Sequence, residues 1–472
     1  MDGFLGIDIG TTNSKGILLN QSGRIISVWK QTTPRLKKGS RCYFDIGKIA
    51  EYTDQWIQEA EGLTKLISVG FSSIGESVVP IKDGRAIGMP LVWYEQTADI
   101  PLHKKELIER HGDFGITGVH KTLTLGVYKM IWMQENELLK VPDFWLPVCS
   151  YLVYRKTGIA MWDTSQAGRS YIYNIHQKKW QTDVMEELGI TLPRKVGMLG
   201  DSCGSSDGII YGLGGHDHYV GLYGVCKLYG GTDLFYDSMG SSSVLALIRE
   251  DGEQNLGGRV TYNAGGGCLV TGFKSGEYVI SRAFDYYGRV LECLANMGGG
   301  KGDAKFYQNV NKDLLTLPSL ERLCRIACPR DYGPYAEQAE GINLLDIMDR
   351  CTPEELMLSG YLYLALGTNR LYTDLGQYCG NAQQDIPYFA GGGITGNKMF
   401  MEWKASALGR KITVLQTAEI SALGAAISGI CACGRGEALK ELKEKLSGGE
   451  VIEPRQDYRE YILEMKRRYE GN

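Results

Sequence analysis

The strongest chemical signal lies in the first turn of the chain, where a carboxylate precedes a pair of hydroxyl side chains. Asp8 ends a short apolar run, and Thr11 and Thr12 follow three and four residues later. Such a turn between two strands offers backbone N–H groups and hydroxyls to an anion, while the carboxylate could hold a metal ion directly or through water. The combination suits Mg²⁺ and a nucleoside triphosphate, although an ordinary β-turn is an open alternative. It is not a Walker A loop, which needs Gly-Lys-Ser/Thr at the start of a helix.

A second candidate carboxylate sits in a glycine-rich turn further along the chain. Residues 214–218 read Gly-Gly-His-Asp-His, which leaves Asp217 without bulky neighbours on one side. In phosphoryl transfer to an alcohol, a base accepts the hydroxyl proton as the P–O bond forms, and positioning supplies most of the catalysis. Asp217 fits that role. Two alternatives stay open: a metal site that uses His216 and His218, which a strand would point the same way, and a purely structural turn.

A third turn repeats the chemistry of the first one. Gly240, Ser241 and Ser242 follow a strand-like segment, and their likeness in kind to the opening turn suggests an internally duplicated fold. Each half would then carry one turn that grips phosphate, with a cleft between the halves. We therefore expect the second half to begin near residue 230, which divides the chain into residues 1–230 and 231–472.

A run of three glycines links an expected strand to an expected helix. The bare backbone of Gly391, Gly392 and Gly393, followed by a helix N-terminus at Asn397, could receive a phosphate or the edge of an adenosine. A tight strand-to-helix turn explains the same residues equally well.

Length and composition describe an ordinary globular protein of more than one domain. The chain has 472 residues, of which 43% are hydrophobic and 22% are charged, and its formal net charge is −4. This charge argues against nucleic-acid or acidic-membrane partners, and no apolar run reaches the 18 residues that a membrane span needs. The start lacks the features of a signal peptide, and the 12 cysteines, without CxxC pairs, suit free thiols in a reducing cytoplasm.

Hydrophobic periodicity and turn residues predict an α/β chain. Asp45 is placed to cap an amphipathic helix, and a segment rich in Ala, Gly and Ser near the C-terminal end suits tight packing on a sheet. We expect strands over 4–9, 16–19, 24–31, 65–71, 386–390 and 411–415, and helices over 45–60, 97–111, 122–139, 279–297, 354–378, 397–408 and 419–431, with two surface helices after residue 436.

A series of motifs resembles the FGGY family of carbohydrate kinases, which includes kinases for glycerol, xylulose, ribulose, gluconate and fuculose. Any one motif is weak, but their order and spacing run nearly from end to end of the chain and are typical of the family. The resemblance implies two ribonuclease-H-like lobes of the actin type, with ATP and substrate in the cleft between them. The motifs occupy residues 6–12, 162–167, 214–217, 238–242, 390–393 and 419–426.

The resemblance also assigns roles to single residues. Asp217 matches the family's catalytic base, and Asp8 matches its Mg²⁺-associated aspartate, which holds the ion through water. For Lys15, the alternative to a phosphate contact is a solvated charge on a strand. The nucleotide is expected to contact Thr11, Thr12 and Lys15 in the first phosphate loop, Gly240, Ser241 and Ser242 in the second, and Gly391, Gly392, Gly393 and Asn397 in the nucleoside region.

The acceptor pocket is where members of the family differ. Glu76 resembles the glutamate with which glycerol kinases hold the polyol, and Trp93 falls on a pocket aromatic of many members; a surface charge and core packing are the respective alternatives. A carboxylate can accept two hydroxyl hydrogen bonds, and an indole can cover a C–H face. Glu95 stands where an aspartate is usual, and Thr97 replaces an arginine, which makes an acidic substrate less expected. His216 completes the expected acceptor contacts.

These observations lead to the hypothesis of an ATP- and Mg²⁺-dependent kinase for a neutral sugar or polyol, located in the cytoplasm. Its partner is expected to be a small molecule, and a homodimer is left open as its assembly. Two other functions also stay open. One is an ATPase switch of the same fold, as in the activators of radical dehydratases, and the other is a non-catalytic sugar or nucleotide sensor.

Overall fold

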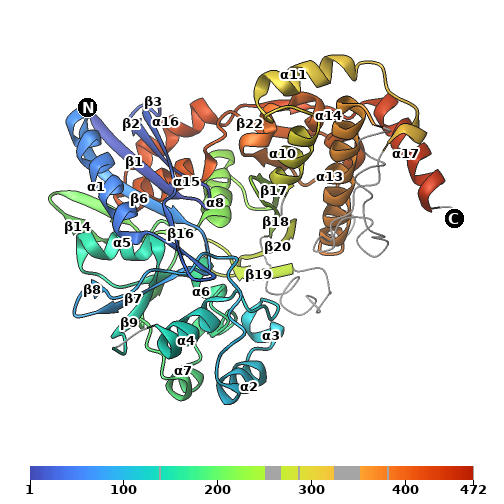
Figure 1. Ribbon diagram of the computed structural model, residues 1–472. Coiled ribbons are helices and arrows are strands. Elements are labelled where there is room, and N and C mark those ends of the chain that lie inside the picture. The colour runs from blue at the N-terminus through green and yellow to red at the C-terminus, as the bar shows by residue number, and fades with distance from the viewer. Residues whose placement is uncertain (138–139, 250–266, 285–286, 324–350, 380–381, 471–472) are drawn as a thin grey trace. The chain divides into compact units, whose positions relative to one another are not determined.

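The computed structural model describes residues 1–137, 140–249, 267–284, 287–323, 351–379 and 382–470 (Figure 1). Contacts within the chain define two compact units. The expected division into residues 1–230 and 231–472 remains a prediction: the first compact unit draws on both of these parts, whereas the second lies wholly within 231–472. The first unit comprises Met1–Thr232, Ile248–Ile280 and Glu419–Ser447, and the second comprises Asp233–Leu247, Ser281–Ala418 and Gly448–Asn472.

The first unit is built on a mixed sheet with the strand order β14-β15-β6-β1-β2-β3, in which β16 also pairs with β6 (Figure 1). The chain begins as a meander of β1 (Asp2–Ile9), β2 (Asn13–Asn20) and β3 (Ile25–Thr32). After helix α1 (Ile46–Leu63), β6 (Lys65–Ser73) pairs in parallel with β1. The apolar residues of β1 point to both faces and are buried, as expected of a central strand that is covered on both sides.

Helices cover both faces of this sheet. On one face lie α1, which the Asp45 carboxylate caps as predicted, and α5 (Val148–Thr157). On the other face, α8 (Asp217–Tyr229) and α15 (Ile420–Ala432) pack against each other (Figure 1). Segments from opposite ends of the sequence therefore build one core.

Glycines in the central strands allow α15 to approach closely. A Cβ atom at Gly6 of β1 would overlap the carbonyl oxygen of Ala422, and one at Gly70 of β6 would overlap the carbonyl oxygen of Ala425. These obstacles are backbone atoms, which cannot rotate away as a side chain does. The predicted tight packing of this helix on a sheet is confirmed, and it brings Glu419 beside the hairpin of β1 and β2.

Smaller elements complete the first unit. Two short sheets, β4 with β5 and β8-β7-β9, lie outside the main sheet, as do the pairs β10-β13 and β11-β12. The bounds of the smaller elements are β4 (Arg35–Lys38), β5 (Arg41–Phe44), β7 (Val78–Lys82), β8 (Arg85–Ala86), α2 (Leu102–His111), α3 (Phe114–Thr117), α4 (Gly126–Asn136), β9 (Phe144–Pro147), β10 (Trp162–Asp163), α6 (Thr164–Gly168), β11 (Tyr173–Asn174), β12 (Lys179–Trp180), α7 (Thr182–Leu188), β13 (Val196–Gly197), β14 (Ser202–Ser206), β15 (Ile209–Gly212), β16 (Gly215–His216), β19 (Gly267–Thr271) and α16 (Gly436–Leu446).

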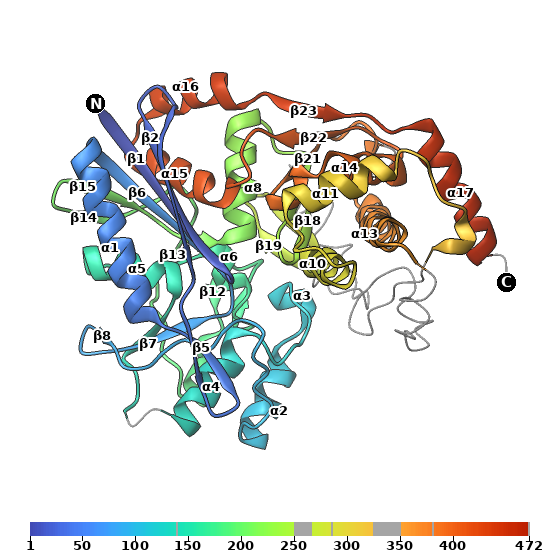
Figure 2. The same ribbon diagram turned by 45° about the horizontal axis from the view of Figure 1, so that its top comes forward.

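The second unit contains strands in the order β18-β17-β21-β22-β23. The pairs β17–β21 and β21–β22 are parallel, whereas β22 and β23 run antiparallel, side by side in Figure 2. Thr352 and Glu355 form a capping box that starts the long helix α13, with proline in its first turn. The bounds are β17 (Leu234–Met239), β18 (Ser243–Arg249), α10 (Tyr287–Met297), α11 (Ala304–Asp313), α13 (Pro353–Gly376), β21 (Tyr388–Gly391), α14 (Lys398–Leu408), β22 (Ile412–Leu415), β23 (Gly449–Ile452) and α17 (Gln456–Glu470), and β20 (Tyr278–Phe284) crosses from the first unit into the second.

Periodicity located most of these elements to within a few residues, and three differences stand out. The expected helix over 279–297 is wrong in its first part, because β20 ends at Phe284 and α10 begins at Tyr287; the β-branched start of this segment favours a strand. The helix expected over 97–111 begins only after Pro101, which lacks a backbone N–H and restricts the preceding residue. The two predicted surface helices after residue 436 are present, but β23 separates them.

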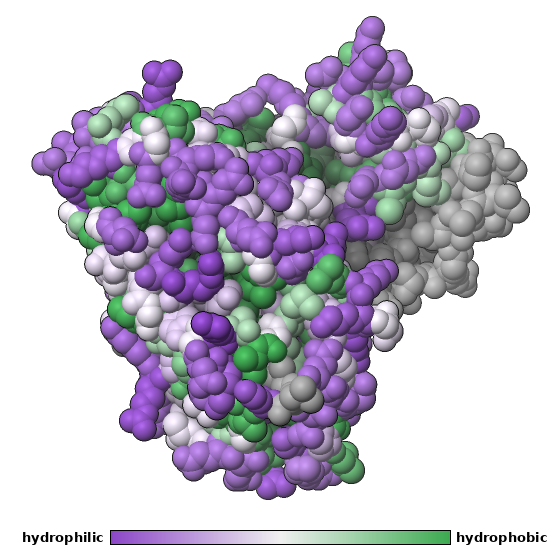
Figure 3. All heavy atoms as spheres, turned by 60° about the vertical axis from the view of Figure 1, so that its left-hand side comes forward, coloured by the Kyte–Doolittle hydropathy of each residue, from purple (hydrophilic) through white to green (hydrophobic). Residues whose placement is uncertain are grey.

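The visible surface fits the ordinary composition. On the face seen in Figure 3, hydrophilic residues predominate and hydrophobic residues occur in scattered groups. Over the residues that the structure describes, no helix combines the length and apolar character needed to cross a membrane.

The contact between β6 and α15 can be tested with one added methyl group. Gly70→Ala should lower the free energy of unfolding by about 1–3 kcal/mol or more, because its Cβ meets backbone atoms of α15. Gly62→Ala is the matched control, since its Cβ would point into open space near the end of α1, and it should be neutral or slightly stabilising. Thermal unfolding followed by circular dichroism compares the two. Equal midpoints would show that the close packing is absent.

Candidate functional site

Neighbouring strand ends bring together the carboxylates of the two predicted turns. Asp8 of β1 lies opposite Ser72 of β6, and Gly215 of β16 lies opposite the same Ser72 from the other side. Parallel strands end at one edge of a sheet, so Asp8 and Asp217, the residue that follows β16, reach the same edge. The Ser72 hydroxyl donates a hydrogen bond of 2.5 Å to the Asp8 carboxylate.

Asp217 is the first residue of α8 and is held as a carboxylate. Its Oδ1 accepts a hydrogen bond of 2.8 Å from the backbone N–H of His218 and lies 2.8 Å from Nδ1 of His216. Burial alone would raise the pKa of Asp217, but the positive charge and hydrogen bonds of the two histidines outweigh burial and lower it. The helix N-terminus also favours negative charge. The carboxyl group of Asp217 is therefore ionised at neutral pH.

Asp8 is the opposite case. Its side chain is buried, and burial followed by repulsion from Asp217 raises its pKa, which the Ser72 hydrogen bond lowers only in part. A cation beside Asp8 would compensate for both effects. Carboxylate oxygens are ligands that Mg²⁺ prefers, so the chemistry of this residue fits the predicted metal.

The opening turn connects the predicted phosphate loop to the predicted acceptor pocket. The indole Nε1 of Trp93 donates a hydrogen bond of 2.9 Å to the hydroxyl of Thr11. The Thr33 hydroxyl donates to the carbonyl of Gly10 at 2.7 Å and steadies the turn from outside. Thr12 is exposed and therefore accessible to a ligand.

Lys15 lies where the sequence predicted it, but with a partner. In the hairpin of β1 and β2 it stands directly opposite Asp8. Its ammonium group forms an ion pair with Glu419 at the start of α15, and both side chains are one-quarter exposed (25%). The positive charge of Lys15 therefore lies near Asp8, at the same edge of the sheet, although Glu419 neutralises part of this charge.

Glu76 is buried and paired with an arginine that the sequence reasoning did not single out. The Glu76 carboxylate accepts from Arg169 Nε at 2.5 Å, and Arg169 Nη2 lies within the same distance. Burial would raise the pKa of Glu76, but Arg169 first, then His216 and Lys129, lower it. Glu76 also has a φ of 56°, a left-handed conformation that is uncommon outside glycine and often marks a functional constraint. The surface-charge alternative for Glu76 is thus excluded.

The residue before Glu76 makes room for a histidine. A Cβ atom at Gly75 would lie 2.5 Å from Cδ2 and 2.6 Å from Nε2 of His216. The imidazole of His216 therefore occupies space that any larger residue at position 75 would take. Glu76, His216 and Asp217 are in this way brought together on one side of the site.

A buried lysine organises the other side. The ammonium group of Lys129, on α4, donates a hydrogen bond of 2.7 Å to the backbone carbonyl of Trp93. Its side chain is 0% exposed, and burial lowers its pKa to about 7 against the raising effect of Glu76 and Glu95. Glu95 itself pairs with Arg41 and accepts from the backbone N–H of Cys42, so its contacts are with the β4–β5 hairpin.

A buried network behind the site holds the histidine backbone. Asp163 caps α6, and its carboxylate accepts hydrogen bonds from Ser165 Oγ at 2.5 Å and from the backbone N–H groups of Ser165 and Gln166. The Ser165 hydroxyl in turn accepts from the backbone N–H of His216 at 3.0 Å. The motif at residues 162–167 thus positions the turn that carries Asp217.

The second unit brings its two predicted loops together. Gly240 follows β17, and its backbone N–H donates to the carbonyl of Ser242 at 2.9 Å, which closes a tight turn. Ser238 lies opposite Gly391 in the parallel pair of β17 and β21. Gly392 has a φ of 120°, and a Cβ there would overlap the Met239 carbonyl, so only glycine fits.

Asn397, expected near the nucleoside, is engaged in local structure. Its side-chain oxygen caps α14 by accepting from the backbone N–H of Phe400 at 3.2 Å and also accepts from Asn311 Nδ2 at 2.9 Å. Its amide nitrogen donates to the Tyr361 hydroxyl at 2.8 Å. These contacts give Asn397 a structural role, and a nucleotide contact stays a prediction.

An ion pair lies directly beneath the second loop. Asp237 and Lys404 are both 0% exposed and paired, and Asp237 also accepts from Ser243 Oγ at 2.8 Å and from the Tyr388 hydroxyl at 2.7 Å. A buried pair that is satisfied in this way fixes its neighbourhood, because breaking it would leave an uncompensated charge.

Comparison with known proteins decides the family. The sequence profile of the N-terminal domain of the FGGY family of carbohydrate kinases matches residues 4–209, and that of its C-terminal domain matches residues 264–433. The chain belongs to the FGGY family of carbohydrate kinases. It is therefore a phosphotransferase, and the family implies ATP as a substrate and a small-molecule sugar or polyol as the acceptor.

Individual relatives agree with this assignment. A glycerol kinase of Thermococcus gammatolerans is 22% identical over 96% of this chain and 94% of its own length. A xylulose kinase of Bacillus subtilis is 25% identical, over 55% of this chain and 56% of that protein. Among solved structures, the xylulose kinases of Rhodospirillum rubrum (TM-score 0.80, 17% identity, 99% and 98% of the two chains) and Lactobacillus acidophilus (TM-score 0.77, 15% identity, 100% and 97%) share the fold. The predicted two-domain α/β fold of the actin and hexokinase type is confirmed.

The open alternatives are not favoured by family membership. The family consists of carbohydrate kinases, whereas the switch hypothesis rested on the likeness of the opening turn. For the metal site suggested by His216 and His218, the rings lie 5.6 Å apart. Across the described part of the chain, no group of three or more His, Cys, Asp or Glu residues is arranged to hold a metal ion.

Sequence reasoning missed two residues that contact the predicted site residues, Arg169 at Glu76 and Lys129 at Trp93. Arg169 follows the motif at 162–167 by two positions, and that position was the only available signal. Lys129 is a single charge within an apolar stretch of α4, where a buried lysine needs a reason.

The buried charge of Lys129 predicts an effect on stability. The unfolded chain keeps this proton up to about pH 10.4, whereas the folded protein releases it near pH 7. The wild-type protein should therefore gain stability relative to Lys129→Met as pH rises from 7 to 10, by up to a few kcal/mol. Unfolding midpoints at pH 6 and 9 measure this difference. The exposed residue Lys37 supplies the control Lys37→Met, and a difference that does not change with pH would contradict the prediction.

Proposed function

We propose that this FGGY kinase transfers the γ-phosphoryl group of ATP to a hydroxyl of a neutral sugar or polyol, with Asp217 as the general base. One observation carries the proposal: Asp8 and Asp217 reach the same sheet edge with pKa values shifted in opposite directions. Carboxylates whose environments differ in this way are suited to different roles. The ionised one accepts a proton, and the buried one accepts a cation.

In the proposed reaction, the acceptor oxygen bonds to the γ-phosphorus while the bond from that phosphorus to ADP breaks. The acceptor proton passes to the carboxylate of Asp217. The backbone N–H of His218 and the imidazole of His216 hold this carboxylate in place. Positioning and neutralisation of charge carry most of the catalysis in such a loose transition state.

The nucleotide is proposed to lie on the glycine-rich loops, with Mg²⁺ held by Asp8 through water. When bound, the ion would neutralise charge on the transferring phosphates. Support comes from the exposed hydroxyl of Thr12 and the backbone of the tight turns. The proposed contacts in the first unit are Thr11, Thr12 and Lys15, and those in the second unit are Gly240, Ser241, Ser242, Gly391, Gly392, Gly393 and Asn397.

The acceptor is proposed to lie against Glu76, Arg169, Trp93 and His216. The pair of Glu76 and Arg169 offers acceptors and donors of hydrogen bonds side by side, which suits hydroxyl groups because each hydroxyl both donates and accepts. Glu95 is proposed to act indirectly through Arg41 and the β4–β5 hairpin. A cytoplasmic location is part of the same proposal, and a homodimer stays open as the assembly.

The experiment that tests the function measures ADP release from Mg·ATP with a panel of possible acceptors. The panel contains glycerol, tetritols, pentitols, ketopentoses, deoxyketoses and sugar acids. We expect release that depends on one neutral acceptor class. Release that is independent of any acceptor would favour an ATPase, and a sugar acid as the best acceptor would contradict the neutral-substrate proposal.

Asp217→Asn should lower kcat by about 100- to 10,000-fold, the range that general bases supply, while the affinity for ATP stays nearly unchanged. The amide keeps the shape of the side chain but cannot take the proton. Steady-state kinetics and an ATP titration measure the two effects. Asp207→Asn is the control, because Asp207 is exposed in the turn between β14 and β15 and its left-handed φ of 53° tolerates asparagine. Full turnover in Asp217→Asn would remove it from the role of base.

The hydrogen bond between Trp93 and Thr11 predicts coupled effects of two substitutions. Trp93→Phe and Thr11→Val each break this 2.9 Å bond, so each should lower kcat/KM by about 5- to 50-fold. The double variant should be no worse than the more damaged single variant, because the shared contact is lost once. Trp29→Phe, which removes a hydrogen bond to Glu59 on the surface, is the control. Purely additive losses would show that the bond does not link the two parts of the site.

A further inference from the structure

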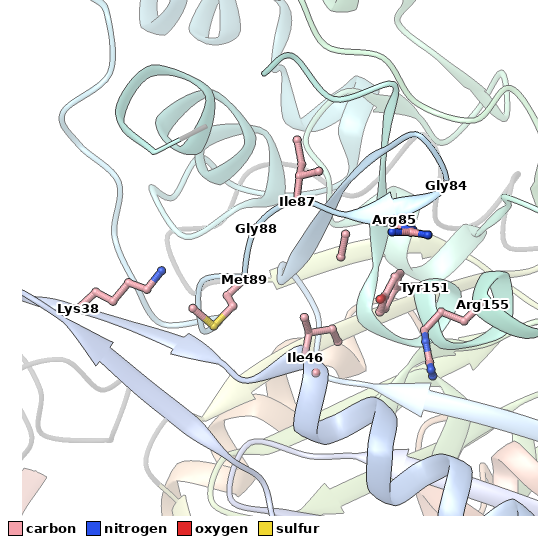
Figure 4. Close-up of a pocket in the computed structure, with 11 residues that line it drawn as sticks. Lys38, Ile46, Gly84, Arg85, Ile87, Gly88, Met89, Tyr151 and Arg155 are labelled. Carbon is pink, nitrogen blue, oxygen red and sulfur yellow. The ribbon is translucent and has the colours of Figure 1, made fainter. Parts of the chain in front are cut away.

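A cavity of about 610 Å³ lies in the first unit, apart from the residues proposed for the kinase reaction. It is bordered by the start of α1, the β7–β8 hairpin with the segment that follows it, α5 and the end of β4 (Figure 4). Its size falls within the range of small-molecule pockets. The lining residues used below are Lys38, Ile46, Arg85, Met89, Tyr151 and Arg155.

All charged residues that line this cavity are cations. Lys38, Arg85 and Arg155 come from three separate elements, and no carboxylate is part of the lining. Arg155 forms a bidentate ion pair with Asp54, in which Nη1 lies 3.3 Å from Oδ1 and Nη2 lies 2.9 Å from Oδ2. Asp54 also pairs with Lys156, so one carboxylate serves two cations there and leaves a positive excess.

The two remaining cations, Lys38 and Arg85, are exposed. Among the residues that the structure describes, neither Lys38 nor Arg85 forms an ion pair with a carboxylate. The ammonium group of Lys38 lies 5.5 Å from the centre of the Tyr43 ring, a contact that leaves its charge available. A cavity whose charged lining residues are all cations favours an anionic occupant.

Between these cations lies an apolar floor. Figure 4 shows Met89, Ile46 and Tyr151 between Lys38 on one side and Arg85 and Arg155 on the other. Ile46 and Tyr151 are buried, at 5% and 9% exposure, so the floor is fixed by packing. A ligand that matches this arrangement carries an anionic group and a body that covers carbon-rich surface.

We propose that this cavity binds a small organic phosphate at a site distinct from that of the phosphoryl transfer. The phosphate dianion would bind to the cations of the lining, Lys38, Arg85 and Arg155. Guanidinium groups bind phosphate oxygens in a planar, bidentate geometry. The organic body rests on the floor of Ile46, Met89 and Tyr151. The proposal goes beyond the kinase function and does not depend on it, since none of these residues takes part in the proposed reaction.

Phenyl phosphate is a suitable probe, because it combines a phosphate dianion with a flat apolar body. Isothermal titration calorimetry of the full-length protein should give one site with a Kd of about 1 mM or lower. Inorganic phosphate should bind more weakly because it lacks the body, and benzyl alcohol should not bind because it lacks the charge. Binding of the two phosphates with equal affinity would contradict the role of the floor.

Charge reversal locates the site. Lys38→Glu and Arg85→Glu should each weaken the binding of phenyl phosphate about tenfold or more. Lys37→Glu is the matched control, because Lys37 is the exposed neighbour on β4, does not line the cavity and points to the other side of the strand. Unfolding midpoints near that of the wild-type protein establish that the variants are folded. If Arg85→Glu is not folded, Arg85→Gln replaces it.

Three outcomes would overturn the proposal. The first is binding to Lys38→Glu and Arg85→Glu that equals binding to the wild-type protein, which would place the probe elsewhere, for example on the loops proposed for ATP. The second is an equal loss in Lys37→Glu, which would indicate a general effect of surface charge. The third is no binding of phenyl phosphate at any concentration up to about 10 mM.

Discussion

Burial of charge at one edge of the first sheet is the constraint on which the candidate site depends. A buried carboxylate costs several kcal/mol unless a cation or hydrogen bonds accompany it. Glu76 has Arg169, and Asp163 has the N-terminus of α6 and a serine hydroxyl. Asp8 accepts a hydrogen bond from the Ser72 hydroxyl, and this bond and the charge of Lys15 lower its pKa, but Lys15 is paired with Glu419 and the pKa of Asp8 stays raised. The protein therefore keeps one buried carboxylate undercompensated, and this is the position at which a bound cation contributes most.

Glycines set how closely elements can approach in both units. In the first unit, Gly6 and Gly70 admit the backbone of α15, which carries Glu419 to the end of the first hairpin. In the second unit, Gly392 admits the backbone of Met239, so that two glycine-rich loops lie next to each other. Glycine has two effects here, because the lack of a Cβ atom allows closer packing in the core and leaves backbone N–H groups accessible to a ligand.

Local sequence patterns predicted the strands, the caps and the order of the glycine-rich turns, because these depend on residues near one another in the chain. These patterns do not report contacts between residues that are distant in the sequence. Arg41, 54 positions before Glu95, binds its carboxylate, while a contact of Glu95 with the acceptor stays a prediction. Arg169 reaches Glu76 across 93 positions, and no local pattern reports such a pairing. Part of the expected helix over 279–297 is the strand β20, where β-branched residues outweigh a weak helical period.

The pairing of Glu76 with Arg169 changes the reason for expecting a neutral acceptor. From the sequence, the argument rested on Thr97, which stands where relatives place an arginine. In the structure Thr97 is fully buried, and its hydroxyl donates to the carbonyl of Leu123, so this position forms no part of the pocket lining proposed above. An acidic acceptor would have to compete with Glu76 for Arg169 and place a second negative charge beside a buried carboxylate. A hydroxyl at the proposed position would need no such exchange, because it could donate to Glu76 and accept from Arg169 while the pair stays intact.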